Sequence, residues 1–185
     1  MDFLKVVLPN QIQCKDELRL KAVFLEDAES FLTVITENQK HFSRFEFIAP
    51  TFETLQEIQD VIQSLCIHKT SYSGASYGLW NEEFLLGLFT INQIDWANRT
   101  ADIGFWLTET STGKGFARIA LKSLINCCSG VLNLNVLTAH TAVSNIRSQS
   151  VLEKAGFNRK NLLKDHIHVR GKSVDEFLYT LVMPK

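Results

Sequence analysis

Two short motifs hold the residues whose types and spacing suit chemistry: the turn Gly113-Lys114-Gly115 and the polar pattern Asn145-x-x-Ser148. The turn follows an apolar run of strand length at 103–107 and precedes apolar residues at helical spacing. Its two glycines let the backbone approach a ligand closely. A helix that begins there presents free N–H groups and the positive end of its dipole, so the turn is suited to bind a phosphate group.

The charge pattern around the turn agrees with an anionic ligand. The chain has 19 basic and 20 acidic residues and is nearly neutral overall. Positive charge is nevertheless concentrated near the turn, because no Asp or Glu occurs between Glu109 and Glu153 and this interval carries Lys114, Arg118, Lys122 and Arg147. An anion bound there would meet little repulsion, although solvated charges on a helix would give the same pattern.

Two common phosphate-binding patterns do not fit. A phosphate loop of the Walker type needs Gly-x-x-x-x-Gly-Lys-Ser/Thr, which is absent. A dinucleotide fingerprint starting at Gly113 would need a small residue at Arg118 and an acidic residue about 20 positions later. A Rossmann-type oxidoreductase is therefore a distant alternative, and a glycine turn that binds nothing remains another.

The run from Thr112 to Ala117, Thr-Gly-Lys-Gly-Phe-Ala, resembles the acyl-CoA loop of the GNAT acetyltransferases, Gln/Arg-x-x-Gly-x-Gly/Ala at a strand-to-helix junction. Thr112 departs from the Gln or Arg that the family usually has. Residues 94–107, 38–45 and 151–157, together with Asn145-x-x-Ser148, resemble the branch that acetylates the N-terminal serine or alanine of ribosomal proteins. The resemblance covers nearly the whole chain.

The resemblance implies acetyl-CoA as the acetyl donor. In the family, two central parallel strands splay apart and the pantetheine arm pairs with the main chain of the first. The implied acetyl-CoA contacts are Phe105, Trp106, Leu107, Thr112, Gly113, Lys114, Gly115, Phe116, Ala117 and Asn145. For the side chains of residues 105–107, core packing is an equally good interpretation.

The implied reaction is direct attack of an amine on the thioester. The resemblance places Ser148 beside the sulfur, where its hydroxyl would protonate the departing thiolate, and Asn145 against the pantetheine or the reacting carbonyl. The residue types alone favour Asn145 as the N-cap of a helix that has Ser148 in its first turn.

The general base is not evident from the sequence. Several relatives carry a Glu on the strand after the Gly-Phe motif, where this chain has Ile167. On a regular strand Asp165 would share the face of Ile167, and His166 and His168 would point the other way. We interpret each of these as a solvated strand residue rather than a catalyst, although a histidine titrates near neutral pH.

The acceptor is expected to be a protein N-terminus, such as that of a ribosomal protein. A free α-amine has a pKa near 7.7 to 8.0 and a lysine amine one near 10.4, so the α-amine needs less help to become neutral. The resemblance places His41 and Arg44 in the acceptor groove, with Ala49-Pro50 further along, although a helix end and loop would explain the same letters. A polyamine or aminoglycoside acceptor, and a non-catalytic acyl-CoA-binding module, remain alternatives.

The expected fold is α/β: a GNAT-like mixed, mostly antiparallel sheet with a splayed central parallel strand pair, flanked by helices, in a single domain over 1–185. Periodicity predicts strands near 17–24, 76–80, 84–91 and 100–107 and helices at 27–38 and after Thr54-Leu-Gln-Glu57, which has capping-box spacing. A βαβ unit over 100–139 includes a helix that begins at Phe116 and ends at Ser129-Gly130.

Composition limits which other classes of protein this chain could belong to. With 45% hydrophobic and 21% charged residues, 185 residues suffice for a substantial core. Asp2, Pro9 and the lack of a long apolar run predict a cytoplasmic protein that binds neither membrane nor, given the absence of a basic block, nucleic acid. Four cysteines without metal-type spacing predict buried packing and no metal. A monomer and a homodimer are both compatible with the sequence.

Overall fold

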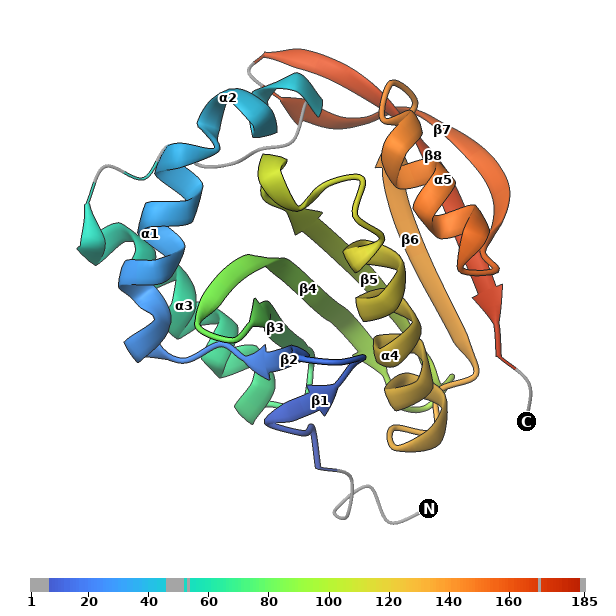
Figure 1. Cartoon of the computed structure of the whole chain (residues 1–185). Helices are drawn as coiled ribbons and strands as arrows, with labels where there is room; N and C mark the ends of the chain where they lie inside the picture. Colours follow the sequence, from blue (N-terminus) through green and yellow to red (C-terminus); the bar gives the residue numbers. More distant parts are fainter. Residues whose placement is uncertain (1–6, 46–51, 53, 170, 184–185) are drawn as a thin grey trace.

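An eight-stranded sheet with the order β1-β2-β3-β4-β5-β6-β8-β7 forms the centre of the computed structural model (Figure 1). The structure describes residues 7–45, 52, 54–169 and 171–183. The strands are β1 (Gln11–Gln13), β2 (Leu18–Ala22), β3 (Ala75–Asn81), β4 (Phe84–Asp95), β5 (Thr100–Leu107), β6 (Val136–Ala142), β7 (Asn158–Val169) and β8 (Lys172–Val182).

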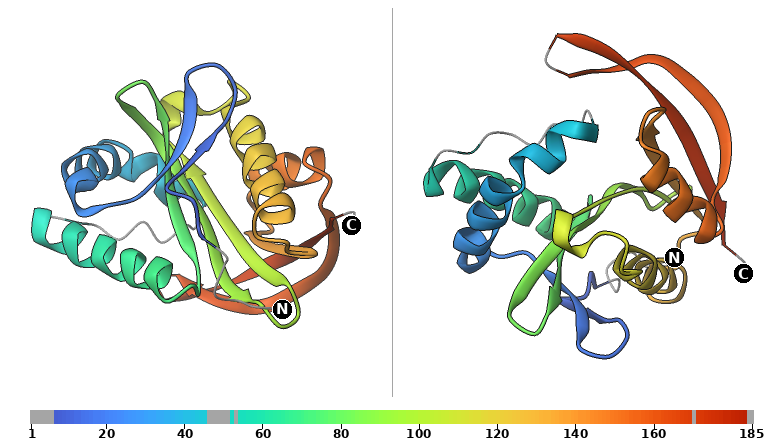
Figure 2. Two further views of the ribbon diagram at one scale, coloured as in Figure 1. Left: turned by 90° about the horizontal axis from the view of Figure 1, so that it is seen from below. Right: turned by 45° about the horizontal axis from the view of Figure 1, so that its top comes forward.

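Helices cover both faces of the sheet (Figure 2). On one face lie α1 (Ala28–Glu37) and α3 (Leu55–Thr70), and on the other lie α4 (Phe116–Gly130) and α5 (Ile146–Lys154). Shorter helical segments are α2 (Gln39–Phe42) and the 3-10 turns η2 (Leu25–Asp27), η3 (Ser43–Phe45) and η4 (Glu109–Ser111). Figure 1 shows α2 and the β7–β8 hairpin reaching toward the same end of β5.

Strands β5 and β6 form the parallel pair in an otherwise antiparallel sheet. Their ladder begins at Thr100 with Val136 and ends at Ile103 with Ala139, whereas β5 continues to Leu107 and β6 to Ala142. The strands therefore separate over their last residues, and β5 keeps ladder partners there in β4. The expectation of a mixed sheet with a splayed parallel pair is confirmed.

Helix α4 follows its amphipathic pattern closely. Its buried residues recur at the spacing of one helical face: Ala117, Ala120, Leu121, Leu124, Cys127 and Cys128. Arg118 and Lys122 lie on the exposed face. The interpretation of the adjacent cysteines as buried packing is confirmed, and burial raises the pKa of the Cys127 thiol to about 11.

Helix α3 begins with the capping box that its sequence predicts. The Thr54 hydroxyl accepts a hydrogen bond from the Glu57 backbone N–H at 3.3 Å, and the Thr54 N–H donates to the Glu57 carboxylate at 3.2 Å. Ile58 and Ile62 are buried against α1 and the sheet, but Val61 is 41% exposed. Helix α1 is preceded by the 3-10 turn η2, so it begins one residue later than the pattern suggested.

Strand β7 is irregular, although the sequence analysis assumed a regular strand when it placed the candidate bases at residues 165–168. Its pairing with β8 shifts between Leu163 and Ile167, and Asp165 has a φ of 50°, in the left-handed region. The predicted alternation is therefore wrong at Asp165 and His166, whereas the pairing is regular again from Ile167 to Val169. The bulge leaves Asp165 exposed and brings His166 against Glu176.

Within the described residues, no helix is both long and apolar enough to span a bilayer.

Candidate functional site

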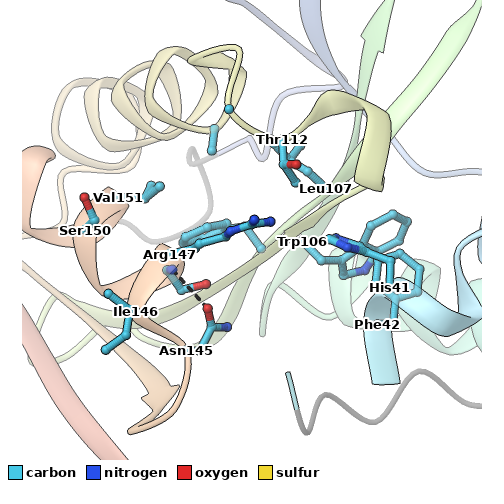
Figure 3. A pocket seen from close by; sticks show the side chains of 14 residues that line it. His41, Phe42, Trp106, Leu107, Thr112, Asn145, Ile146, Arg147, Ser150 and Val151 are labelled. Carbon is cyan, nitrogen blue, oxygen red and sulfur yellow. Dashed lines mark hydrogen bonds between the residues drawn. The ribbon is translucent and has the colours of Figure 1, made fainter. Parts of the chain in front are cut away.

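A cavity of about 630 Å³ lies where β5, α2 and the first turns of α4 and α5 meet (Figure 3). The β5 residues in its lining lie beyond the last ladder pair of β5 with β6. The residues that line it are His41, Phe42, Phe105, Trp106, Leu107, Thr112, Gly113, Ala117, Asn145, Ile146, Arg147, Ser148, Ser150 and Val151. The glycine turn and the polar motif, about 30 residues apart in sequence, thus reach one space.

The end of β5 contributes both packing and a main-chain edge. The Phe105 ring stacks on Phe89 with centroids 5.6 Å apart, and the Trp106 ring meets Phe42 edge-on at 5.1 Å. These side chains therefore pack as core aromatics, which was the alternative to a cofactor role. Because β6 has turned away, the backbone edge of Phe105 to Leu107 that faces the gap has no ladder partner among the described strands.

The glycine turn places backbone rather than side chains at the start of α4. Gly113 and Gly115 have φ values of 76° and 83°, which residues with a side chain adopt only at a cost. No atom outside their chain neighbours lies within 4 Å of a Cβ built at either glycine, so the backbone there is open. The Thr112 hydroxyl donates to the Glu109 carbonyl at 2.7 Å and fixes the approach to the turn.

Only part of the predicted acetyl-CoA loop lines the cavity. Thr112, Gly113 and Ala117 do, together with residues 105–107 and Asn145. Lys114 and Phe116 instead line a second cavity of about 850 Å³, which faces α1 and the β3–β4 hairpin. Gly115 is the left-handed residue before the first residue of α4 and lines neither of the two.

Asn145 and Ser148 are joined by a helix cap. The Asn145 side-chain oxygen accepts a hydrogen bond from the Ser148 backbone N–H at 3.1 Å, as the dashed line in Figure 3 shows. The capping interpretation is confirmed, and both residues also line the cavity. Buried Gln149 donates to the Ala142 and Val143 carbonyls at 3.2 and 2.9 Å, which fixes the start of α5 to the end of β6.

Arg147 gives the cavity a cationic wall. Its side chain points from α5 across the cavity toward the side that carries Trp106 and His41 (Figure 3). Of the four basic residues between Glu109 and Glu153, Arg147 is the one that lines this cavity. The expected clustering of positive charge thus reaches the site through α5, whereas Arg118 and Lys122 point outward from α4.

His41 and Phe42 bring α2 to the opposite wall. His41 is only 4% exposed, and its burial holds the pKa of the imidazole below the usual histidine value, with smaller effects from Glu109, Arg147 and Arg44. A neutral imidazole therefore faces the cavity at pH 7. Residues 38–45 resemble the substrate-side segment of the family, and within this segment His41 and Phe42 line the cavity.

Arg44 lies outside the cavity. Its guanidinium pairs with the Glu109 carboxylate at 2.7 Å, and both side chains are about half exposed. The ion pair joins the η3 segment to the η4 turn that precedes the glycine turn. Ala49-Pro50, which the sequence places further along from His41 and Arg44, lies outside the described residues.

Three lining residues were missed by the sequence reasoning as binding residues: Ile146, Ser150 and Val151. Positions 147, 148 and 151 share a face of α5, so the helical period after Asn145 would have indicated Val151. Asp165, His166, Ile167 and His168 are not among the residues that line the cavity. The site thus carries a hydroxyl, a guanidinium and a buried neutral imidazole.

Comparison with known proteins gives consistent matches. A model of the acetyltransferase (GNAT) domain family matches residues 17–158. The putative ribosomal N-acetyltransferase YdaF of Bacillus subtilis is 27% identical over 91% of this chain and 94% of its own length. The ribosomal-protein-serine acetyltransferase of Escherichia coli is 25% identical over 93% and 96%. A crystal structure of the microcin C7 self immunity acetyltransferase MccE, in complex with acetyl-CoA and AMP, has a TM-score of 0.87 at 26% identity, over 96% and 99%.

Proposed function

The chain belongs to the GNAT acetyltransferase family, and on that premise we propose that it transfers the acetyl group of acetyl-CoA to the N-terminal α-amine of a protein. The protein is an N-acetyltransferase of the GNAT type, as its family and its relatives show. The observation that carries the proposal is the separation of β5 from β6 directly beside the glycine turn and above a cavity of about 630 Å³.

The residues present fit acetyl-CoA. The open backbone of Gly113 and the start of α4 offer N–H groups to phosphate oxygens, and the acid-free interval up to Glu153 leaves positive charge nearby. The edge of β5 at residues 105–107 offers main-chain groups to an amide-containing chain. Acetyl-CoA, when bound, would supply the thioester whose acetyl group is transferred.

Ser148 and Asn145 are the proposed catalytic residues. Ser148 lies half-buried in the first turn of α5 and lines the cavity, so its hydroxyl can donate a proton or hydrogen bond to a departing thiolate. Asn145 holds that turn in place by capping it, and its amide N–H groups remain available to the cavity. Residues on a capped helix are held more precisely than residues on a loop.

His41 and Arg44 are the proposed acceptor-side residues. His41 faces the cavity directly and is neutral near pH 7, so it does not repel an incoming ammonium group. Arg44 acts through its ion pair with Glu109, which positions the segment that follows α2. An α-amine is the favoured acceptor because a tenth or more of it is already neutral near pH 7.

The named relatives support this acceptor class, since two of them are described as ribosomal acetyltransferases. A competing class is a polyamine, because a spermidine N(1)-acetyltransferase of Vibrio cholerae is 28% identical over 49% of this chain. The shorter span of that match makes the polyamine the second choice.

Thermal unfolding with acetyl-CoA, with NAD and ATP as controls, tests the cofactor. At about 100 times the dissociation constant, ligand linkage contributes roughly 2.7 kcal/mol, which should raise Tm by about 5 to 10 °C. A shift with NAD alone would overturn the assignment.

Release of free CoA then tests the acceptor. Peptides beginning with Ser or Ala should give turnover above that with spermidine or an aminoglycoside. Faster turnover with spermidine would reassign the acceptor, and binding of acetyl-CoA without turnover on any amine would leave a non-catalytic acyl-CoA-binding module.

A further inference from the structure

Two histidines and two carboxylates gather on the sheet face opposite α4, outside the cavity already described. Asp102 comes from β5, His140 from β6, His166 from β7 and Glu176 from β8. The neighbours of His140 on β6, Leu137 and Ala139, are buried in the core beneath α4, so alternation along the strand puts His140 on the other face.

Each imidazole is held by its own carboxylate. His140 Nδ1 lies 3.1 Å from Asp102 Oδ1, and His166 Nδ1 lies 2.7 Å from Glu176 Oε2. The two rings stack with centroids 5.2 Å apart and planes inclined by 24°. An ionised carboxylate can only accept a hydrogen bond, so Nδ1 is the donor in each pair. The neutral form of each ring then carries its lone pair on Nε2.

His140 stands where the two parallel strands part. The last ladder pair is Ile103 with Ala139, and His140 is the next residue of β6. Phe105, the first residue of β5 that lines the cavity, lies one residue beyond the level of His140, about 3.3 Å further along the strand. The cavity is lined from both faces of the sheet at this level, by Trp106 on the face of His140 and by Phe105 on the face of α4, so the gap between the strands opens beside His140.

Gly104 leaves β5 without a side chain between Asp102 and Trp106 on this face. Side chains of β4 lie over it, because a Cβ built at Gly104 would come within 2.9 Å of the Thr90 hydroxyl and 3.8 Å of the Asn92 amide nitrogen. An amine that approaches the gap from this side would meet His140, whose side chain is 31% exposed.

We propose that His140 is the general base of the acetyl transfer, a role that rests on the proposed function, and that Asp102 is its positioning residue. An N–H bond of the acceptor ammonium breaks, its proton binds His140 Nε2 directly or through water, and the freed nitrogen lone pair attacks the acetyl carbonyl. The carbon–sulfur bond then breaks, the sulfur takes a proton at Ser148, and the second amine proton restores that hydroxyl. His140 releases its proton to solvent.

The charges around His140 suit this task. The groups that face it among the described residues are Asp102 from β5, Glu176 from β8 and the ring of His166 from β7. The hydrogen bond to Asp102 raises the pKa of His140 above the usual histidine value, against the opposing effect of burial. A base whose pKa lies nearer that of an α-amine takes its proton more readily.

Two alternatives compete with His140 as the base: a purely structural role for the cluster, and His41 as the base. Asp102 also accepts a hydrogen bond from the Thr138 hydroxyl at 2.9 Å, so the cluster could simply hold β5 to β6. His41 is the other imidazole near the reaction, but burial lowers its pKa and weakens it as a base. A structural role and a base differ in the dependence of turnover on pH.

The pH profile of kcat at saturating acceptor peptide is the decisive measurement. H140Q keeps a side chain that can donate to Asp102 but removes the basic nitrogen, so kcat at pH 7 should fall by about 100-fold or more. The acid limb that the wild-type protein shows should disappear in this variant. In D102N the acid limb should move to lower pH, because the pKa of His140 returns toward its usual value.

His168 provides the matched control. It lies on β7 two residues beyond His166 and pairs with the exposed Ser173 hydroxyl at 3.1 Å. H168Q should leave kcat and its acid limb unchanged. An H140Q enzyme whose acid limb matches the wild type, or an H41Q enzyme that loses the limb, would overturn the proposal.

An NMR titration of the histidine side chains, together with acetyl-CoA binding, separates this proposal from the proposed function. The His140 resonance should titrate above the ordinary histidine value of 6.5, and it should move back toward that value in D102N. A His140 that titrates at or below 6.5 overturns the proposal without any assay of activity. Acetyl-CoA should still raise the Tm of H140Q. A wild-type protein that releases no CoA with any amine would overturn the proposed function itself.

Discussion

Arg44 and Glu109 form a 2.7 Å ion pair that joins η3, after α2, to η4, before the glycine turn. The same turn is held a second time, because the Glu109 N–H donates to the Asn38 side chain at 2.8 Å. The wall of the cavity that carries His41 is therefore fixed to the loop that leads to the start of α4. Acceptor-side and cofactor-side elements are thus mechanically connected.

Loss of this ion pair should weaken acceptor binding without unfolding the protein. Both side chains are about half exposed, and such pairs contribute at most about 1 kcal/mol to stability. R44A should raise the KM for the acceptor peptide a few fold, leave acetyl-CoA affinity unchanged and change Tm by no more than about 4 °C. E109Q should do the same. A KM that rises in R44A alone would show that Arg44 contacts the acceptor itself.

Removal of the Ser148 hydroxyl should slow turnover selectively. S148A keeps the backbone N–H that Asn145 caps, so the helix should form as before. With acetyl-CoA and acceptor saturating, kcat should fall by about 100-fold or more, since a positioned proton donor typically contributes about 10²- to 10⁴-fold. The dissociation constant of acetyl-CoA should change little. Ser150 also lines the cavity and gives the control S150A, and equal kcat values in the two variants would remove Ser148 from the mechanism.

The glycine turn should be sensitive to any side chain. Gly115 has a φ of 83°, and a residue with a Cβ pays about 1 to 2 kcal/mol to adopt it, although no neighbour would clash. G115A should therefore distort the start of α4 and weaken acetyl-CoA binding at least about tenfold, measured by calorimetry. Gly130, at the other end of α4, has open space and no left-handed conformation. G130A, the control, should bind acetyl-CoA as the wild type does. If G115A also binds acetyl-CoA with wild-type affinity, the glycine turn takes no part in binding.

Local patterns predicted the elements that position the cavity. The apolar run of β5, the buried stripe of α4 and the caps of α3 and α5 each depend on residues within a few positions, so periodicity and cap chemistry suffice to find them. The regular strand assumed across Asp165 failed because a bulge is set by pairing with β8. Strand register cannot be read from one strand alone.

The cluster of His140, Asp102, His166 and Glu176 could not be predicted from the sequence, because it too depends on strand register. His140 and Asp102 are 38 positions apart and meet because Ala139 pairs with Ile103 in a parallel ladder. His166 faces Glu176 only through the irregular end of β7. The contact of Phe42 with Trp106, which joins α2 to β5, also depends on packing between elements. A group of residues from several strands depends on strand register, whereas a group within one turn can be predicted from the local sequence.

Asn145 combines a structural role with a proposed contact, and two substitutions separate them. N145A removes the cap of α5 and should cost about 1 kcal/mol, or about 2 to 4 °C in Tm. N145D keeps a capping oxygen, so Tm should stay near the wild-type value. It also adds a negative charge within the acid-free interval, so acetyl-CoA affinity should fall. An N145D protein with wild-type affinity would limit Asn145 to capping.

Two histidines should make opposite contributions to stability as pH changes. His140 has a folded-state pKa raised by Asp102, so its stabilisation is complete below the ordinary value of 6.5 and is lost as pH rises through the raised pKa. His41 has a pKa lowered by burial, so stability falls as pH drops from 6.5 through the lowered value. The net pH dependence of the wild-type protein therefore mixes two opposite effects.

Comparison of variants resolves the two contributions. H140Q retains His41, so the difference in Tm between wild type and H140Q contains only the pairing of His140 with its carboxylates. This difference should be larger at about pH 5.5 than at about pH 8.5. The difference between wild type and H41Q should change in the opposite direction, with the wild type relatively less stable at the lower pH. Scanning calorimetry at the two pH values measures both, and a wild-type to H140Q difference that grows with pH would mean that Asp102 does not stabilise protonated His140.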